Sequence, residues 1–193
     1  MHYQRLLKIN FPVKSRTIFL WGARRTGKST FLKEQFPNAH RIDLLSQREL
    51  LRYAKEPHLF YEEYNRKVVT SSSTKPIILD EVQKVPALLD EVQRLIEEDH
   101  QYLILCGSSA RKLKRGHANL LGGRAWKYVL HPLTYAEIGS KFTLNRALNQ
   151  GLIPDHYLET QFEKSLQAYV EDYLKEEIQM EGLVRNLPAF ARF

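Results

Sequence analysis

The chain has 193 residues, enough for one sizeable hydrophobic core or for one domain with an appendage. Hydrophobic residues make up 43% and charged residues 26%, and no apolar run approaches the roughly 20 residues of a membrane helix. The absence of such a run argues against a membrane protein, and the cysteine content favours a cytoplasmic one. The single cysteine, Cys106, excludes an intrachain disulfide and fits a reducing compartment. A net charge of +7 permits binding to nucleic acid without establishing it.

The first predicted elements are a strand and a helix with a glycine-rich segment between them. Thr17–Trp21 is a short apolar run with β-branched and aromatic residues, which is typical of a buried strand. Ser29–Phe36 has helical periodicity and is followed by Pro37. The segment between them, Gly22–Ser29, fits G-x-x-x-x-G-K-[ST], the phosphate-binding P-loop, in the strand–loop–helix context that this motif requires.

The spacing within the P-loop predicts a site for a nucleoside triphosphate with Mg²⁺. Gly22 and Gly27 let the backbone curl so that successive N–H groups point inward, and the helix N-terminus adds positive charge there. Lys28 then reaches the β- and γ-phosphates, and the hydroxyl of Ser29 binds Mg²⁺. The residues predicted to contact the nucleotide are consecutive: Gly22, Ala23, Arg24, Arg25, Thr26, Gly27, Lys28, Ser29 and Thr30.

Strands and helices continue to alternate after the P-loop helix. A short strand is predicted over His40–Leu45, helices over Arg48–Lys55 and Leu59–Lys67, and a loop over Ser71–Pro76.

Two carboxylates follow the apolar run Ile77–Leu79, which has the composition of a central parallel strand. An acid at the end of such a strand is the Walker B arrangement, so Asp80 is predicted to hold Mg²⁺, mainly through water. The neighbouring Glu81 is predicted to orient and polarise an attacking water, as hydrolysis requires. The alternative interpretation is that both acids are solvated at the start of the next helix.

The following segment supplies a helix and a further candidate at a strand end. Val85–Glu98 is predicted to be an amphipathic helix, and Tyr102–Cys106 to be a buried strand that runs into Gly107. Ser108 or Ser109 could hydrogen-bond the γ-phosphate or the attacking water. A loop or helix-cap role explains these serines equally well.

The last predicted strand of the core, Trp126–His131, is preceded by an arginine. Arg124 is a candidate to contact the γ-phosphate of its own or of a neighbouring subunit. A surface salt bridge is the alternative interpretation.

Strands that alternate with helices predict right-handed crossovers and a three-layer α/β/α fold around a mainly parallel sheet. In such sheets, ligands bind at the carboxyl ends of the strands. The P-loop, Asp80, Glu81 and Ser108 all follow strands, so we expect them to converge at one edge of the sheet.

The segments at the strand ends also carry a family resemblance. They are Phe19–Thr30, Ile78–Gln83, Leu105–Arg111, Leu121–Ala125 and Leu130–Glu137. Their combination resembles the AAA+-like P-loop ATPases of bacteria and archaea, in which the AAA domain precedes a C-terminal domain of unknown function. The resemblance implies an ATP-binding core with the AAA+ strand order, with Lys28, Ser29 and Asp80 at the nucleotide and Mg²⁺. It also implies that Glu81 is the catalytic acid, while Ser108 lies where many AAA+ proteins carry an asparagine sensor.

The remainder of the chain is predicted to be helical. Apolar residues recur at helical spacing from Leu158 to Ile178, and a new apolar face begins after Pro188. We therefore expect residues 1–155 to form the P-loop ATPase domain. Residues 156–193 are expected to be the helical start of a C-terminal domain that is truncated here.

These observations leave three hypotheses. The first is an AAA+-type ATPase that hydrolyses ATP to ADP and phosphate with Mg²⁺, slowly if an arginine finger must come from another subunit of a homo-oligomer. The second is a nucleotide-gated DNA-binding module that uses the basic residues of positions 111–117, which a solvated loop would also explain. The third is a P-loop kinase, against which Asp80 and Glu81 argue. The sequence does not name a physiological target.

Overall fold

The computed structural model describes residues 3–13, 16–65, 75–99, 101–108, 113 and 121–172. The chain divides into two compact units, one of Leu6–His131 and one of Met1–Arg5 with Pro132–Phe193. Compact units need not coincide with domains, and the predicted division into residues 1–155 and 156–193 stays a prediction. Within the described ranges, no helix has the length and apolar character needed to cross a bilayer.

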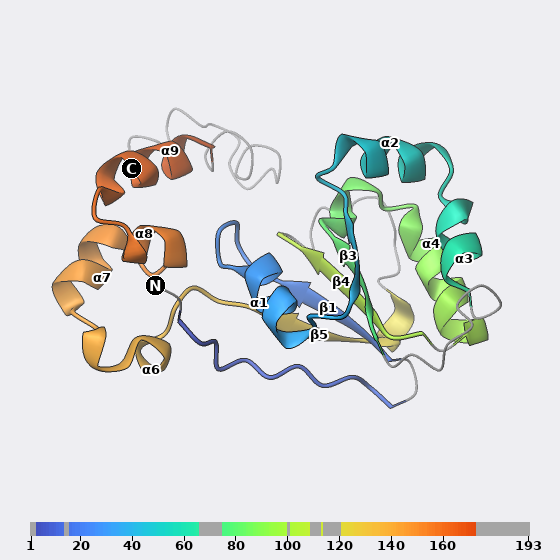
Figure 1. Ribbon diagram of the computed structural model, residues 1–193, viewed down its shortest axis with the longest axis horizontal. Helices are drawn as coiled ribbons and strands as arrows, with labels where there is room; N and C mark the ends of the chain where they lie inside the picture. The colour runs from blue at the N-terminus through green and yellow to red at the C-terminus, as the bar shows by residue number, and fades with distance from the viewer. Residues whose placement is uncertain are drawn as a thin grey trace. The chain divides into compact units, whose positions relative to one another are not determined.

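The unit Leu6–His131 is built on a five-stranded parallel sheet (Figure 1). The strands are β1 (Thr17–Trp21), β2 (His40–Asp43), β3 (Ile77–Asp80), β4 (Leu103–Gly107) and β5 (Ala125–Val129). Their order across the sheet is β2-β3-β4-β1-β5, which places β1 and the loop after it near the middle. The predicted parallel sheet and its AAA+ strand order are therefore confirmed.

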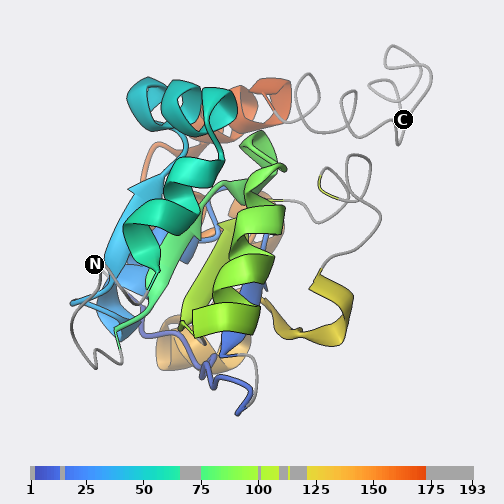
Figure 2. The same ribbon diagram turned by 90° about the vertical axis from the view of Figure 1, so that its right-hand side faces the viewer.

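Side chains alternate between the two faces of each strand, and both faces of β1, β3 and β4 are buried. On one face, Ile18, Ile78 and Ile104 pack against Phe31 and Leu32 of α1 (Lys28–Gln35). On the other face, Phe19, Leu79 and Leu105 pack in one cluster with residues of three helices. These helices are α2 (Gln47–Lys55), α3 (His58–Tyr64) and α4 (Leu88–Arg94). Figure 2 turns this second, three-helix face toward the viewer. The three-layer α/β/α prediction is confirmed.

The predicted helix Val85–Glu98 begins three residues later in the structure and changes its helix type at Leu95. A 3₁₀ turn, Val82–Lys84, comes first, α4 begins only at Leu88, and a π-type turn, Leu95–Asp99, follows it. Proline restricts the preceding residue to extended backbone, and Val85, which precedes Pro86, has φ −131° and ψ 76°. The helix therefore cannot continue through Val85.

An N-terminal segment, which the sequence did not assign, covers part of the α1 face. Leu7, Ile9 and Phe11 alternate toward the cluster that contains α1. The hydroxyl of Tyr128 donates to the carbonyl oxygen of Asn10 at 2.9 Å and accepts from its N–H at 3.1 Å. Because these contacts join residues 118 positions apart, no local sequence pattern predicts them.

The second unit is helical over its described residues, although the sequence predicted helix only from about residue 156 onward. It comprises α6 (Tyr135–Ile138), a 3₁₀ turn (Gly139–Lys141), α7 (Leu144–Gln150), α8 (Pro154–Leu158) and α9 (Phe162–Asp172). Leu158 ends α8 instead of beginning the predicted tail helix, because Glu159 is extended and α9 starts at Phe162. The tail beyond position 172, with its expected apolar face, lies outside the described residues.

A buried ion pair ties the start of the chain to α6 within this second unit. The Nε of Arg5 lies 2.9 Å from Oε1 of Glu137, and the two side chains are only 6% and 4% exposed. Glu137 also completes a capping box with Thr134, in which each side chain bonds the other residue's backbone N–H. One carboxylate therefore fixes both the helix start and the N-terminal segment.

Candidate nucleotide-binding site

The loop between β1 and α1 has the backbone of a phosphate cradle. A Cβ on Gly22 would overlap the carbonyl oxygen of Leu130 and lie 3.1 Å from Oγ1 of Thr26, so only glycine fits there. Gly27 has φ 85° and Arg25 has φ 62°, both in the left-handed region. These turns let the loop curl into the N-terminus of α1, where the helix N–H groups favour an anion.

The ammonium group of Lys28 is held inside the curl of this loop. Its side chain is buried, and Nζ donates to the carbonyl oxygens of Gly22 at 2.7 Å and Ala23 at 3.0 Å. Thr26, also buried, donates from Oγ1 to the same Ala23 oxygen at 2.9 Å. The loop therefore presents a fixed positive charge at the place where the motif would seat β- and γ-phosphates.

Ser29 and Asp80 meet although they come from different elements. Ser29 lies in the first turn of α1, and Asp80 is the last residue of β3, on the same face as Ile78. The Oγ of Ser29 donates to Oδ2 of Asp80 at 2.7 Å. A hydroxyl beside a carboxylate provides the oxygen donors that Mg²⁺ takes with several waters, so these two residues could hold it. No group of three or more His, Cys, Asp or Glu side chains suited to a metal occurs among the described residues.

Glu81 occupies a strained turn directly after Asp80. Its backbone has φ 58° and ψ 42°, the left-handed conformation that non-glycine residues rarely adopt, and its N–H donates to Oδ1 of Asp80 at 3.1 Å. The Nε2 of Gln83 donates to Oε2 of Glu81 and, at 3.2 Å, to Oγ of Ser108. Glu81 and Ser108, predicted to lie at one sheet edge, are therefore linked through a third side chain.

Sequence reasoning missed Gln83. Gln83 closes the Ile78–Gln83 segment that carries part of the family resemblance, but no role was assigned to it. The contact with Ser108 spans 25 positions, so it depends on the pairing of β3 with β4.

Two groups, the buried thiol of Cys106 and the half-buried guanidinium of Arg41, interact electrostatically with the Asp80 carboxylate. Burial raises the pKa of the Cys106 thiol well above its usual value, and the negative charge of Asp80 adds to the shift while Lys28 opposes it. Desolvation lowers the pKa of Arg41, and the charges of Asp80 and Cys106 oppose this change. Cys106 is fully buried and therefore a neutral core residue, as expected from its apolar strand.

The remaining predicted P-loop residues lie on the outer side of the curl. Ala23, Arg24, Arg25 and Thr30 are all exposed. They can border a bound nucleotide, whereas Thr26 and Lys28 are the buried side chains of the loop.

Arg124 and the P-loop of the same chain lie at opposite ends of the strands. Strand β5 pairs in parallel with β1, with Ala125 beside Thr17 and Val129 beside Trp21. Arg124 therefore adjoins the amino ends of the strands, whereas the P-loop leaves their carboxyl ends. It lies 3.1 Å from Glu97, with both side chains about half exposed. The structure does not bring Arg124 to the other candidate residues, and a contact with a neighbouring subunit stays a prediction.

Two other expectations lie outside the described residues. They concern Ser109 and the basic segment whose charged members are Arg111, Lys112, Lys114, Arg115 and His117.

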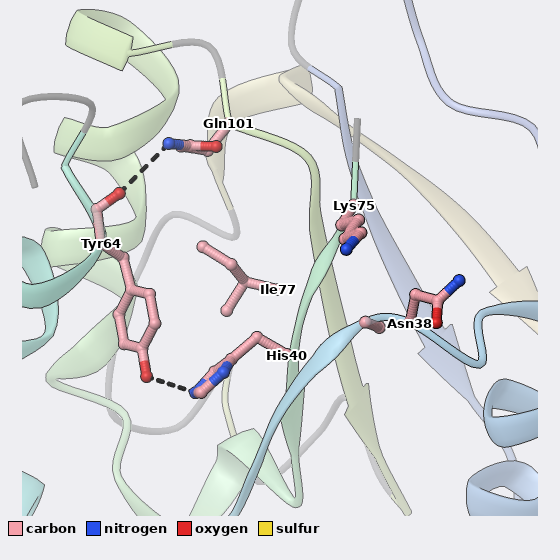
Figure 3. A pocket seen from close by; sticks show the side chains of 7 residues that line it. Asn38, His40, Tyr64, Lys75, Ile77 and Gln101 are labelled. Carbon is pink, nitrogen blue, oxygen red and sulfur yellow. Dashed lines mark hydrogen bonds between the residues drawn. The ribbon is translucent and has the colours of Figure 1, made fainter. Parts of the chain in front are cut away.

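A separate pocket of about 340 Å³ opens at the amino ends of the strands (Figure 3). Its lining consists of Asn38, Ala39, His40, Tyr64, Lys75, Ile77 and Gln101. Inside it, Nε2 of His40 lies 2.6 Å from the hydroxyl of Tyr64, and Gln101 donates to the Tyr64 carbonyl oxygen at 3.2 Å. The P-loop lies at the other, carboxyl ends of the strands, and the pocket shares no residue with it.

A curled glycine-rich loop between β1 and α1, in hydrogen-bonding reach of an acid at the end of β3, on a parallel sheet of this order, defines a P-loop nucleoside-triphosphatase fold. Residues 14–139 match a family model described as an AAA domain, which covers more than half of the chain. The chain therefore belongs to this AAA domain family.

One solved structure with a TM-score above 0.5 shows the same fold. The Walker-type ATPase PABY2304 of Pyrococcus abyssi is 17% identical, with a TM-score of 0.51 over 91% of this chain and 73% of that one. PCH-2 of C. elegans is 18% identical, with a TM-score of 0.43 over 68% of this chain and 44% of that one. No protein with a curated description matches the chain.

Proposed function

We propose that this chain binds ATP with Mg²⁺ at the P-loop and hydrolyses it to ADP and phosphate. The observation that carries the proposal is the 2.7 Å hydrogen bond between Ser29 and Asp80, because it joins the predicted metal donors of α1 and β3. Membership of the AAA domain family supports nucleotide binding. A second carboxylate, Glu81, follows the predicted Mg²⁺ ligand Asp80 and has a strained backbone. We take it as support for ATP hydrolysis rather than ATP binding alone.

Each residue has a defined part in the proposed reaction. Lys28 and the loop N–H groups bind the β- and γ-phosphates and neutralise the charge that develops during transfer. Ser29 and Asp80 would hold Mg²⁺, which would supply positive charge that withdraws electron density from the phosphates. Glu81 orients a water for in-line attack on the γ-phosphorus and accepts hydrogen bonding from it. Ser108 contacts the γ-phosphate or the water.

The test is phosphate release by the unmodified chain and by Glu81→Gln, each with a separate measurement of ATP affinity. We expect Glu81→Gln to keep the affinity and lose hydrolysis. Glu171→Gln is the matched control, since Glu171 is an exposed residue of α9 that accepts from Gln167 at 3.2 Å. Hydrolysis that is unchanged in Glu81→Gln would remove the assigned role.

Other parts of the proposal rest on the sequence alone. A homo-oligomer could supply Arg124 in trans, and a cytoplasmic location fits the single cysteine. DNA binding by the basic segment would weaken steeply with added salt, and flat or absent binding at low salt would exclude it. Phosphate release without an acceptor would separate a hydrolase from a kinase.

A further inference from the structure

Gln83 connects the two candidate residues that would surround the attacking water. Its Nε2 donates to the carboxylate of Glu81, from the turn after β3, and to Oγ of Ser108, from the end of β4. A carboxylate only accepts hydrogen bonds, so the side-chain amide must turn its nitrogen toward Glu81. One NH₂ group therefore sets the separation of an acid and a hydroxyl that belong to different strands.

Space for this amide is provided by a glycine at the end of β4. A Cβ on Gly107 would overlap Oε1 of Gln83 and lie 2.9 Å from the Trp21 ring. The backbone of Gly107 is not in the left-handed region, so conformation alone does not require glycine here. A glycine inside a strand often marks a close approach of another group, and here that group is the Gln83 amide.

Part of the environment of Gln83 opposes folding stability, although its Nε2 is hydrogen-bonded. Its Oε1 is buried and has no hydrogen-bond partner among the residues that the structure describes, which is unfavourable for folding. The neighbouring Glu81 is held in a left-handed conformation that is also unfavourable. Local features that oppose stability tend to gather at functional sites, because selection retains them for activity.

We propose that Gln83 is a positioning residue for the hydrolytic step. It fixes the carboxylate of Glu81 and the hydroxyl of Ser108 relative to each other, and Gly107 maintains the space it needs. This inference rests on the proposed function of Glu81. Gln83 touches neither phosphate nor metal in this role, so its loss affects the turnover of bound ATP more than the binding of ATP.

Three variants test the inference. Gln83→Met keeps the length of the side chain but removes both the donor and the unpaired oxygen. Gln83→Glu keeps the shape, removes the donor and adds a repelling charge. Gly107→Ala changes no polar group but displaces the Gln83 amide. The matched control is Gln93→Met on α4, where Gln93 donates to Glu97 at 3.1 Å on the exposed surface.

The measurements are kcat for phosphate release at saturating ATP, Kd for ATP and Tm. We expect all three test variants to lower kcat roughly 10- to 100-fold, as misplacing a reacting group does, with Kd changed less than about threefold. Gln83→Met should change Tm little, because removing a buried unpaired acceptor offsets the loss of two hydrogen bonds. Gln93→Met should leave kcat and Kd unchanged.

A double-mutant cycle separates positioning from a general structural effect. Because Gln83 is inferred to act through Glu81, adding Gln83→Met to Glu81→Gln should not lower the residual rate further. Multiplied losses in the double variant, equal falls of affinity and kcat, or a kcat within twofold of the parent would overturn the inference. If Gln83→Met does not fold, Gly107→Ala and Gln83→Glu decide it by the same criteria.

The outcome also distinguishes this inference from the proposed function. Phosphate release that depends on Glu81 but not on Gln83 contradicts only the positioning role. Absence of phosphate release from the parent chain, or release unaffected by Glu81→Gln, contradicts the proposed function and the positioning role together.

Discussion

The hydroxyl of Ser29 donates a 2.7 Å hydrogen bond to the carboxylate of Asp80 across 51 positions of sequence. The serine starts the helix after the P-loop, and the acid ends β3, two strands away from β1 in the sheet. Their contact brings the two predicted Mg²⁺ ligands together. In the described ranges, no group of three or more His, Cys, Asp or Glu side chains offers another metal site. A substitution at Ser29 can therefore test whether ATP binding depends on Mg²⁺ held at this place.

Ser29→Ala should weaken the effect of Mg²⁺ on ATP binding by roughly tenfold, because it removes an oxygen donor and a hydrogen bond to a charged group. The measurement is ATP affinity with and without Mg²⁺. Ser46→Ala is a suitable control, since Ser46 precedes α2 without making a side-chain cap. An unchanged Mg²⁺ dependence in Ser29→Ala would contradict the assignment of Ser29 to the metal.

Gly22→Ala should lower both ATP affinity and stability. The added Cβ overlaps the carbonyl oxygen of Leu130, which is backbone and can move only with β5. Overpacking of this kind typically costs about 1–3 kcal/mol. Gly139→Ala meets no atom within 4 Å but has φ 64°, so it should lower Tm through backbone strain while ATP affinity stays unchanged. Equal ATP affinities in the parent and Gly22→Ala would show that the loop accommodates the methyl group.

Arg5→Met should destabilise the second unit strongly. It leaves the carboxylate of Glu137, which is 4% exposed, buried without the guanidinium of Arg5. Breaking a buried pair in this way typically costs about 3–5 kcal/mol. Denaturant unfolding measures the loss. Arg124→Met, which removes a half-exposed partner of Glu97, should cost at most about 1 kcal/mol. Similar losses in the two variants would show that the Arg5–Glu137 pair is not selectively important.

Arg124 also offers a test of assembly. Since its own P-loop lies at the opposite sheet edge, Arg124→Ala should not alter hydrolysis by an isolated subunit. If subunits associate through this edge, the specific activity of the parent should rise with protein concentration and that of Arg124→Ala should not. Equal activity of the two proteins at every concentration would remove a trans role for Arg124.

Tyr53 should make folding sensitive to alkaline pH. Burial raises its pKa above the ordinary tyrosine value, and a 2.8 Å hydrogen bond to Glu63 adds to the shift. The unfolded chain then releases this proton at a lower pH than the folded chain, so stability falls as pH rises above about 10. Tyr53→Phe should reduce that slope in unfolding measured from pH 8 to 11. An identical slope in both proteins would show that Tyr53 ionises normally.

Local patterns were sufficient to predict the framework of this protein. The apolar strand Thr17–Trp21, the P-loop after it and the acid at the end of Ile77–Asp80 each lie within a few consecutive residues. Their chemistry depends on short-range geometry, such as helix N-termini and glycine turns, which spacing in sequence reports directly. Alternation of strands and helices then restricts the sheet to parallel topologies.

The relations between strands required the tertiary structure. Whether Gln83 reaches Ser108, whether Leu130 closes over Gly22, and at which sheet edge Arg124 lies all depend on strand order and register. Side chains from different strands meet only after the whole sheet has formed, and one residue of register reverses the face on which each of them lies. The sequence by itself therefore determined which groups could bind phosphate and metal, whereas packing decided which of them lie together.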